Sequence, residues 1–242
     1  DARPVVAATG YGRLRGLERD GVCTFLGVPF AQSPTGPMRF AAPRPPEPWA
    51  GERDASRHGP CAPQNQGDVL SRLFVDHSSG QSEDCLTLNL WTPAVDDRRR
   101  PVMVWVHGGR FLHGSASESA FDGSCLSRRG EVVVVALQYR LGPLGYAFCN
   151  GSAAWPSNLG LRDQIAALAW VREQIAHFGG DPDNVTLFGH SAGSISAGAL
   201  LGAPAARGLF QRAILQSGPP VALEAAAASP VTDTLLRALS LR

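Results

Sequence analysis

A serine flanked by glycines occurs in the segment Gly189-His190-Ser191-Ala192-Gly193. The apolar run 185–188, expected to be a strand, precedes it, and the stretch 192–201, expected to be a helix, follows it. A sharp strand-to-helix turn raises a serine hydroxyl above a sheet, and the glycines give the crowded backbone room. The pattern therefore predicts that Ser191 is a nucleophile that attacks an acyl carbon. The alternative is a tight glycine turn with an inert serine.

A second glycine-containing segment, His107-Gly108-Gly109-Arg110-Phe111, follows the apolar run 102–106. Glycines at the end of a strand let backbone N–H groups approach a substrate oxygen, as in an oxyanion loop. The N-terminus of the helix after Ser191 offers further N–H groups to a developing negative charge. A simple glycine turn beside a core histidine is the alternative, and the two segments together favour acyl transfer.

The composition excludes several other kinds of chemistry. The 242 residues include 22 Lys+Arg and 21 Asp+Glu, and a formal net charge of +1 gives no electrostatic signature of nucleic-acid or membrane binding. All the basic residues are arginine, so no lysine can form a Schiff base. No cluster has the spacing of metal ligands, so neither a metal nor another cofactor is expected. The longest apolar run, 132–137, is far too short for a membrane span.

The rest of the chain alternates strand-like and helix-like segments. Apolar runs predict strands at 86–91, 102–106, 132–137, 185–188 and 213–215, after two shorter strand-like segments at 12–17 and 23–28. Apolar residues at helical spacing predict helices at 161–178, 192–201 and 232–241. Prolines make 33–48 an extended loop. This alternation indicates an α/β fold with a mostly parallel sheet, and no linker divides residues 1–242 into separate domains.

Further segments point to one known family. They occur in family order over nearly the whole chain: Gly27 to Ala31, Ser82 to Asn89, Pro101 to Gly109, Tyr139-Arg140, Asn158 to Gln164, Phe178 to Pro182, 189–193 and Gln216-Ser217-Gly218. The chain resembles the type-B carboxylesterase and cholinesterase family of α/β-hydrolases. The resemblance implies a mostly parallel central sheet with flanking helices and a small N-terminal antiparallel sheet. It covers the N-terminal half of the family domain, so a truncated α/β-hydrolase domain is expected.

The resemblance also implies roles for individual residues. Ser191 is expected to form an acyl-serine intermediate with a small carboxylic ester. The expected oxyanion hole is formed by the backbone of Gly108, Gly109, Arg110 and Ala192. Two scaffold ion pairs are expected, Arg39 with Glu83 and Arg140 with Asp163.

The chain has five cysteines, Cys23, Cys61, Cys85, Cys125 and Cys149, with no C-x-x-C pair. The residues alone leave open whether they form one or two disulfides, as in an exported protein, or stay reduced, as in a cytosolic one. The family resemblance implies one disulfide, Cys61–Cys85, which favours a secreted or other extracytoplasmic location. The pairing of Cys23, Cys125 and Cys149 is left open.

Two residues near the expected site depart from the family pattern. Arg110 stands where a third glycine is usual, and His190 stands where a glutamate usually precedes the nucleophile. Arg110 can still offer its backbone N–H. Its side chain is expected to lie in solvent or in an ion pair, and a position over the acyl pocket is the alternative. The His190 imidazole is expected to point away from Ser191.

A third departure concerns the catalytic histidine, because no histidine follows Ser191. Triad order in this fold is serine, acid, histidine. The acid and histidine are therefore expected in a C-terminal half, which would be the chain's own partner. Without a general base the 242 residues are expected to be inactive, and their exposed sheet edge is expected to cause aggregation. Two alternatives to an esterase stay open: a non-catalytic binding or adhesion protein of the family, and a truncated pseudoenzyme.

Overall fold

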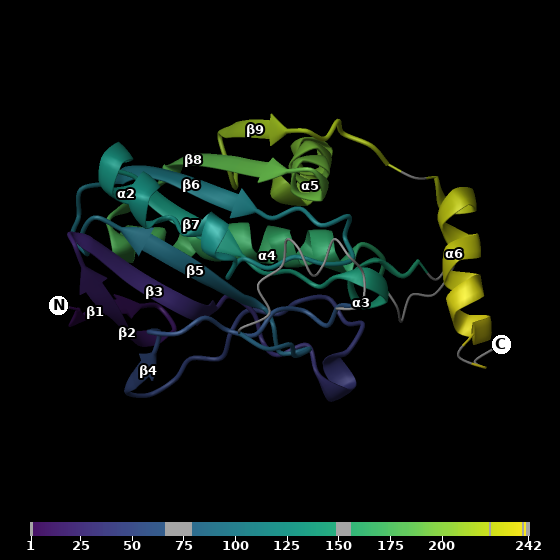
Figure 1. The fold of residues 1–242 in the computed structure, drawn as a ribbon, viewed down its shortest axis with the longest axis horizontal. Coiled ribbons are helices and arrows are strands. Elements are labelled where there is room, and N and C mark those ends of the chain that lie inside the picture. Colours follow the sequence, from purple (N-terminus) through teal and green to yellow (C-terminus); the bar gives the residue numbers. More distant parts are fainter. Residues whose placement is uncertain (1, 66–78, 149–155, 223, 239, 241–242) are drawn as a thin grey trace.

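The fold is built around one mixed β-sheet (Figure 1). The computed structural model describes residues 2–65, 79–148, 156–222, 224–238 and 240. Within them the sheet has nine strands, in the order β1-β2-β3-β5-β7-β6-β8-β9, and β4 pairs with β2 outside this path. The α/β class expected from the alternating pattern is confirmed.

The N-terminal strands form the antiparallel end of this sheet. Four strands precede the central ones: β1 (Arg3–Thr9), β2 (Gly12–Arg19), β3 (Val22–Pro29) and β4 (Glu52–Asp54). β5 (Thr87–Thr92) pairs antiparallel with both β3 and β7, so the expected antiparallel strands are continuous with the parallel part. The sequence did not predict β1 or β4.

The C-terminal half of the sheet is parallel. It consists of β6 (Arg100–Val106), β7 (Val133–Leu137), β8 (Gly180–His190) and β9 (Arg212–Gln216). Every residue of β7 is buried, as the continuous apolar run predicted. In the register of β6 and β8, Val106 lies beside Gly189, so the two motifs of interest begin at neighbouring strand ends.

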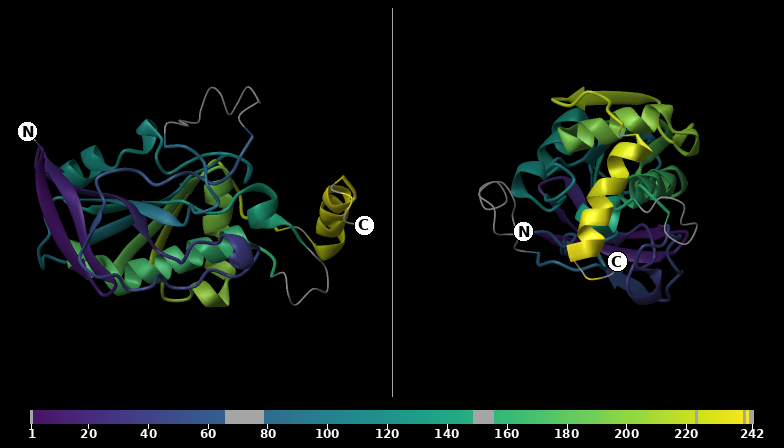
Figure 2. Two further views of the ribbon diagram at one scale, coloured as in Figure 1. Left: turned by 90° about the horizontal axis from the view of Figure 1, so that it is seen from below. Right: turned by 90° about the vertical axis from the view of Figure 1, so that its right-hand side faces the viewer.

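The helices lie on both faces of the sheet and beyond its carboxyl end. They are α2 (Ser124–Gly130), α3 (Gly142–Tyr146), α4 (Leu159–Gln174), α5 (Ala192–Gly202) and α6 (Ala225–Ala238), with short 3₁₀ turns at Gly36–Met38, Ser119–Phe121, Ile175–Phe178 and Pro204–Ala206. α5 packs on β8 and β9, and α2 packs on β5 and β7 of the opposite face (Figure 2). α6 starts earlier than expected and stands apart from the sheet, beyond the carboxyl ends of the parallel strands (Figure 1).

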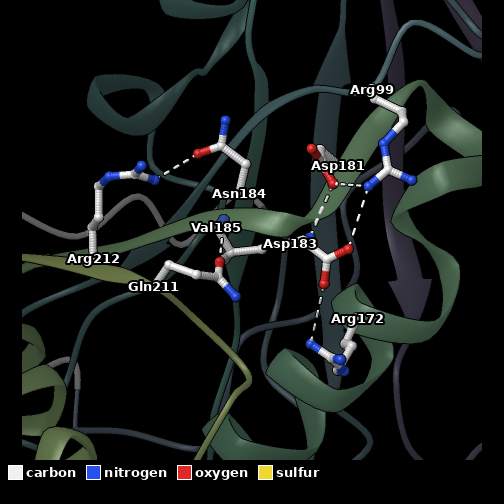
Figure 3. A network of polar contacts seen from close by, with 8 residues as sticks. All are labelled: Arg99, Arg172, Asp181, Asp183, Asn184, Val185, Gln211 and Arg212. Atoms are coloured by element: carbon white, nitrogen blue, oxygen red, sulfur yellow. Dashed lines mark hydrogen bonds and ion pairs between the residues drawn. The ribbon is translucent and has the colours of Figure 1, made fainter.

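The amino ends of the parallel strands are joined by a polar network (Figure 3). Arg99, just before β6, contacts Asp181 at 2.6 Å and Asp183 at 3.3 Å, both on β8. Arg172 of α4 lies 3.8 Å from Asp183, and Arg212 of β9 donates to Asn184 Oδ1 at 2.6 Å. These mostly exposed contacts lie at the opposite end of β8 from Ser191, so we assign them to the scaffold.

Both expected ion pairs are present. The Arg39 guanidinium donates to the two carboxylate oxygens of Glu83 at 2.5 and 2.7 Å. Arg140 donates to Asp163 from Nε at 2.8 Å, from Nη2 at 2.7 Å and from its backbone N–H at 3.0 Å. Asp163 is fully buried, and these three donors compensate for the solvation that its carboxylate loses.

The expected Cys61–Cys85 disulfide is not present in the structure. Both residues are buried free thiols, and Cys61 Sγ donates to the carbonyl of Gly80 at 3.2 Å. Burial raises the pKa of the Cys85 thiol far above its ordinary value, which keeps it protonated. Cys149 lies outside the described residues. The bond therefore stays a prediction for the protein in an oxidising environment.

Candidate functional site

Ser191 occupies the turn between β8 and α5 in an unusual backbone conformation. Its φ is 54° and its ψ is −119°, a combination that non-glycine residues rarely adopt. Its backbone N–H donates to Gln216 at 2.8 Å, which fixes the turn to the end of β9. Among the described residues its hydroxyl makes no hydrogen bond, and the residue is half-buried. These are the features predicted from the glycine-flanked serine.

The two glycines around Ser191 are required by close contacts. A Cβ on Gly193 would lie 2.0 Å from the carbonyl oxygen of Val106, at the end of β6. A Cβ on Gly189 would lie 2.6 Å from the carbonyl carbon of Gly193 and 2.9 Å from the same Val106 oxygen. The start of α5 therefore lies directly against the end of β6, and only glycine permits this approach.

The loop after β6 lies beside this turn. A Cβ on Gly108 would be 2.9 Å from the carbonyl oxygen of His190 and 3.2 Å from Ser191 Cβ. Gly109 has a φ of 110°, and a Cβ there would lie 1.8 Å from the carbonyl oxygen of His113. The structure thus brings the two predicted segments together, with glycine backbone next to the serine.

Hydrogen bonds to carbonyl groups orient the peptide planes of this loop. The Gly109 carbonyl accepts N–H groups from Leu112 at 2.9 Å and His113 at 3.0 Å. In a trans peptide the N–H points opposite to the C=O. The Arg110 N–H therefore points away from these donors, and it makes no hydrogen bond with any residue that the structure describes.

The same argument applies to the Gly109 and Ala192 N–H groups. His107 Nδ1 lies 2.7 Å from the Gly108 carbonyl, which fixes the Gly108–Gly109 peptide. The Ser191 carbonyl accepts the N–H of Ile195 at 2.9 Å, which directs the Ala192 N–H out of the helix start. Neither N–H has a hydrogen-bond partner within the described part of the chain. The N–H groups of Gly109, Arg110 and Ala192 thus have no hydrogen-bond partner within the described residues.

His107 belongs to the supporting core. It is fully buried, stacks on the Tyr139 ring at 4.5 Å, and its own carbonyl accepts the Tyr139 hydroxyl at 2.8 Å. Burial lowers the pKa of His107 to about 4, so the ring is neutral at pH 7. Because a carbonyl only accepts hydrogen bonds, the neutral ring carries its proton on Nδ1, toward Gly108.

The side chains of Arg110 and His190 are both exposed. Arg110 has a φ of 58° and Phe111 a φ of 63°, so both residues adopt the left-handed conformation, and Arg110 does so at the position where the family pattern has a glycine. The Arg110 side chain forms no ion pair with the described residues, which agrees with the expected solvent position. His190 likewise makes no hydrogen bond to Ser191 among them.

No described group replaces the expected catalytic histidine or holds a metal. His107 is fully buried with Nδ1 on the Gly108 carbonyl, and no histidine in the described residues makes a hydrogen bond to Ser191 Oγ. Within the same residues no three His, Cys, Asp or Glu side chains come close enough to bind a metal ion. The described helices include none with the length and apolar content needed to cross a membrane.

Comparison with known proteins defines the family. The model of the carboxylesterase family matches residues 2–238 of the chain. The chain belongs to the carboxylesterase family. This family member is 46% identical over 237 residues to para-nitrobenzyl esterase of Bacillus subtilis (strain 168), a match that covers 98% of this chain and 48% of that protein. It is 48% identical over 229 residues to human carboxylesterase 3, covering 90% of this chain and 39% of the relative.

Solved structures confirm the fold of this carboxylesterase-family chain. A PNB esterase structure superposes with a TM-score of 0.92 at 47% identity, covering 97% of this chain and 48% of that one. A carboxylesterase of Geobacillus stearothermophilus gives a TM-score of 0.90 at 44% identity, and the match covers 98% of this chain and 48% of that one. The fold is therefore that of the α/β-hydrolase carboxylesterases, and the chain spans about half the length of these two structures.

Two residues that support the site were not predicted from the sequence. Tyr139 lay in a matched segment, but nothing in the sequence indicated that its hydroxyl binds the His107 carbonyl. Gln64, in the loop before β5, binds both backbone groups of Gly114 at 2.8 and 3.0 Å. No motif or spacing marks Gln64, because its partner lies 50 positions along the chain.

Proposed function

We propose that this chain carries the nucleophile of a carboxylic-ester hydrolase. Ser191 Oγ attacks the carbonyl carbon of a small carboxylic ester, and collapse of the tetrahedral intermediate expels the alcohol and leaves an acyl-serine. Water then attacks the acyl carbon, releases the carboxylic acid and restores the serine. The observation that carries this proposal is the strained Ser191 at the start of α5, its free hydroxyl beside the loop Gly108–Arg110.

The developing negative charge is held by backbone N–H groups of Gly109, Arg110 and Ala192, while Gly108 permits the close approach of the loop. The carbonyls of the same three peptides, those of Gly108, Gly109 and Ser191, already accept hydrogen bonds. The N–H groups are therefore held in place and need little rearrangement during the reaction. One such donor contributes about 3 kcal/mol to the transition state. The chemistry requires no cofactor.

The triad acid and histidine come from a polypeptide segment that corresponds to the remaining length of the relatives. Two observations support this part of the proposal. None of the described histidines bonds Ser191 Oγ, and the relatives are about twice as long as the region matched. In this fold both residues follow the serine in the chain.

We propose that the segment that carries the triad acid and histidine also covers the β9 end of the sheet. Among the described residues β9 ends the strand order with one edge unpaired, and Ile214 and Leu215 on it are 44% and 38% exposed. On the face that carries α2, a groove of about 430 Å³ is lined by Trp105, Phe121 and Phe188. An apolar edge and groove of this kind are features that a further strand and helix would cover.

A fusion tests the proposal directly. The chain is joined to the part of Bacillus para-nitrobenzyl esterase that its match does not cover, and hydrolysis of p-nitrophenyl acetate is measured. The fusion is expected to turn over, and Ser191→Ala to lower kcat by several orders of magnitude with an unchanged thermal midpoint. Ser229→Ala, on α6, is the matched control, because the Ser229 hydroxyl bonds only the Ala225 carbonyl among the described residues, and it should retain activity. Activity retained in Ser191→Ala would refute the nucleophile assignment.

We also propose an extracytoplasmic location. Its support is the family disulfide expected between Cys61 and Cys85, both of which are free and buried in this structure. Thiol labelling of the protein from its native source tests this: a bonded pair supports the location and two reduced thiols contradict it.

A further inference from the structure

Hydrogen bonds hold the Gln64 side chain beside the oxyanion loop. Its Oε1 accepts the N–H of Gly114 at 2.8 Å, and its Nε2 donates to the Gly114 carbonyl and the Ala62 carbonyl, each at 3.0 Å. Its own N–H donates to Gln81 Oε1 at 3.0 Å. The Gln64 side-chain amide therefore bonds both the N–H and the C=O of Gly114, as the backbone of a neighbouring strand would.

Gly114 in turn lies against the peptide that carries one of the candidate donors. Its φ is 114°, and a Cβ there would lie 2.5 Å from His107 Nδ1 and 2.6 Å from the Gly108 carbonyl oxygen. These are the two atoms whose 2.7 Å contact orients the Gly108–Gly109 peptide. A shift of Gly114 would therefore free or displace that contact.

We propose that Gln64 is a positioning residue for the oxyanion loop. This proposal rests on the proposed function. By holding Gly114 in place, Gln64 keeps His107 Nδ1–H on the Gly108 carbonyl and so keeps the Gly109 N–H aimed at the ester oxygen. The glycines of this loop have wide conformational freedom, and an external clamp restricts it. The effect belongs to the transition state, because the oxygen gains its negative charge there.

A purely structural role for Gln64 gives a different result. If the amide only tied the loop around Ala62 to the body of the protein, its loss would lower stability and leave kcat per folded molecule unchanged. A positioning role lowers kcat while KM changes little, because substrate binding does not depend on the developing charge.

The test uses Gln64→Met in the active fusion described above. Methionine has a similar length and forms neither bond to Gly114. We expect kcat to fall about ten- to a hundredfold with KM nearly unchanged, and amide hydrogen exchange of residues 107–114 to become faster. Gln64→Glu can still accept the Gly114 N–H but cannot donate to the Gly114 carbonyl. Its kcat should therefore lie between those of the unmodified fusion and Gln64→Met. Gln174→Met is the matched control, because buried Gln174 bonds the N–H of Gly10 at the far end of the sheet at 2.8 Å.

Two outcomes would overturn the inference: a kcat of Gln64→Met equal to that of the Gln174→Met control, or unchanged exchange in residues 107–114. The two proposals remain separable. If the unmodified fusion shows no turnover, the proposed function fails, while exchange in the same protein still decides whether Gln64 holds the loop.

Discussion

The carbonyl oxygen of Val106 lies 2.0 Å from the point at which a side chain on Gly193 would begin. This contact joins the end of β6 to the start of α5, and it places the loop after Val106 beside Ser191. The distance between the Ser191 turn and the loop after Val106 is thus set by backbone atoms, which cannot move aside as the end of a flexible side chain can. A glycine in the same helix, Gly202, has nothing within 4 Å of its Cβ position.

Gly193→Ala is expected to destabilise the protein or displace the turn. Overpacking of this kind costs about 1–3 kcal/mol, and no side chain can rotate to relieve it. Gly202→Ala should leave stability unchanged or raise it by up to about 1 kcal/mol, because alanine is the better helix former. Urea unfolding of both variants measures the difference. Equal stability of the two would contradict the contact.

His107 makes stability depend on pH. Burial holds its pKa at about 4, below the ordinary 6.5. Between these values the unfolded chain binds the proton and the folded chain does not, so stability falls as the pH decreases. The loss from this group is about 2 kcal/mol between pH 7 and pH 5, and it levels off only below about pH 3.

The variant His107→Asn removes the titrating group while its amide can still donate to the Gly108 carbonyl. Urea unfolding at pH 7 and pH 5 should show a smaller pH dependence in the variant than in the original chain. Identical pH dependence in the two proteins would show that His107 is not held neutral by burial.

Oxidation is expected to join Cys61 and Cys85. After refolding in oxidised glutathione, when both thiols are still accessible, and removal of mixed disulfides, the chain should be lighter by two hydrogen atoms, and digestion should yield one cross-linked peptide pair. Loop closure should raise the free energy of unfolding by about 3 kcal/mol. Exposed Cys125 provides the control, since Cys125→Ser should change neither result. Separate alkylation of Cys61 and Cys85 after oxidation would refute the pairing.

The unpaired edge at β9 is expected to make the 242-residue chain self-associate. Ile214→Lys places a charge on that edge and should lower light scattering of the chain at a given concentration. Val231→Lys, at a 71% exposed position on α6, adds the same charge elsewhere and should have less effect. A monomeric original chain that melts cooperatively would contradict this expectation.

The sequence predicted the features that depend on neighbouring residues. The turn at Ser191 and the loop at Gly108 were recognised because each glycine-containing segment directly follows an apolar run that predicts a strand. α3 was missed because its sequence, Gly142–Tyr146, contains two glycines and a proline, and its conformation depends on contacts such as Phe111 with Tyr146 at 4.8 Å.

Other features could not be predicted because they depend on distant partners. β1 at Arg3–Thr9 is an edge strand whose seven residues all pair with β2. Gln64 carries no signal of its own, since its role depends on where the fold places Gly114. The start of α6 was placed too late, at residue 232, whereas the helix begins at Ala225 and includes Pro230.

The central claim is that Ser191 is the reactive nucleophile, and covalent labelling tests it most directly. The active fusion and its Ser191→Ala variant are treated with a fluorophosphonate, and intact mass and peptide mapping are recorded. We predict a single adduct on Ser191 and none in the variant. Turnover of p-nitrophenyl acetate without an adduct on Ser191, or an adduct that persists in the variant, would contradict the account.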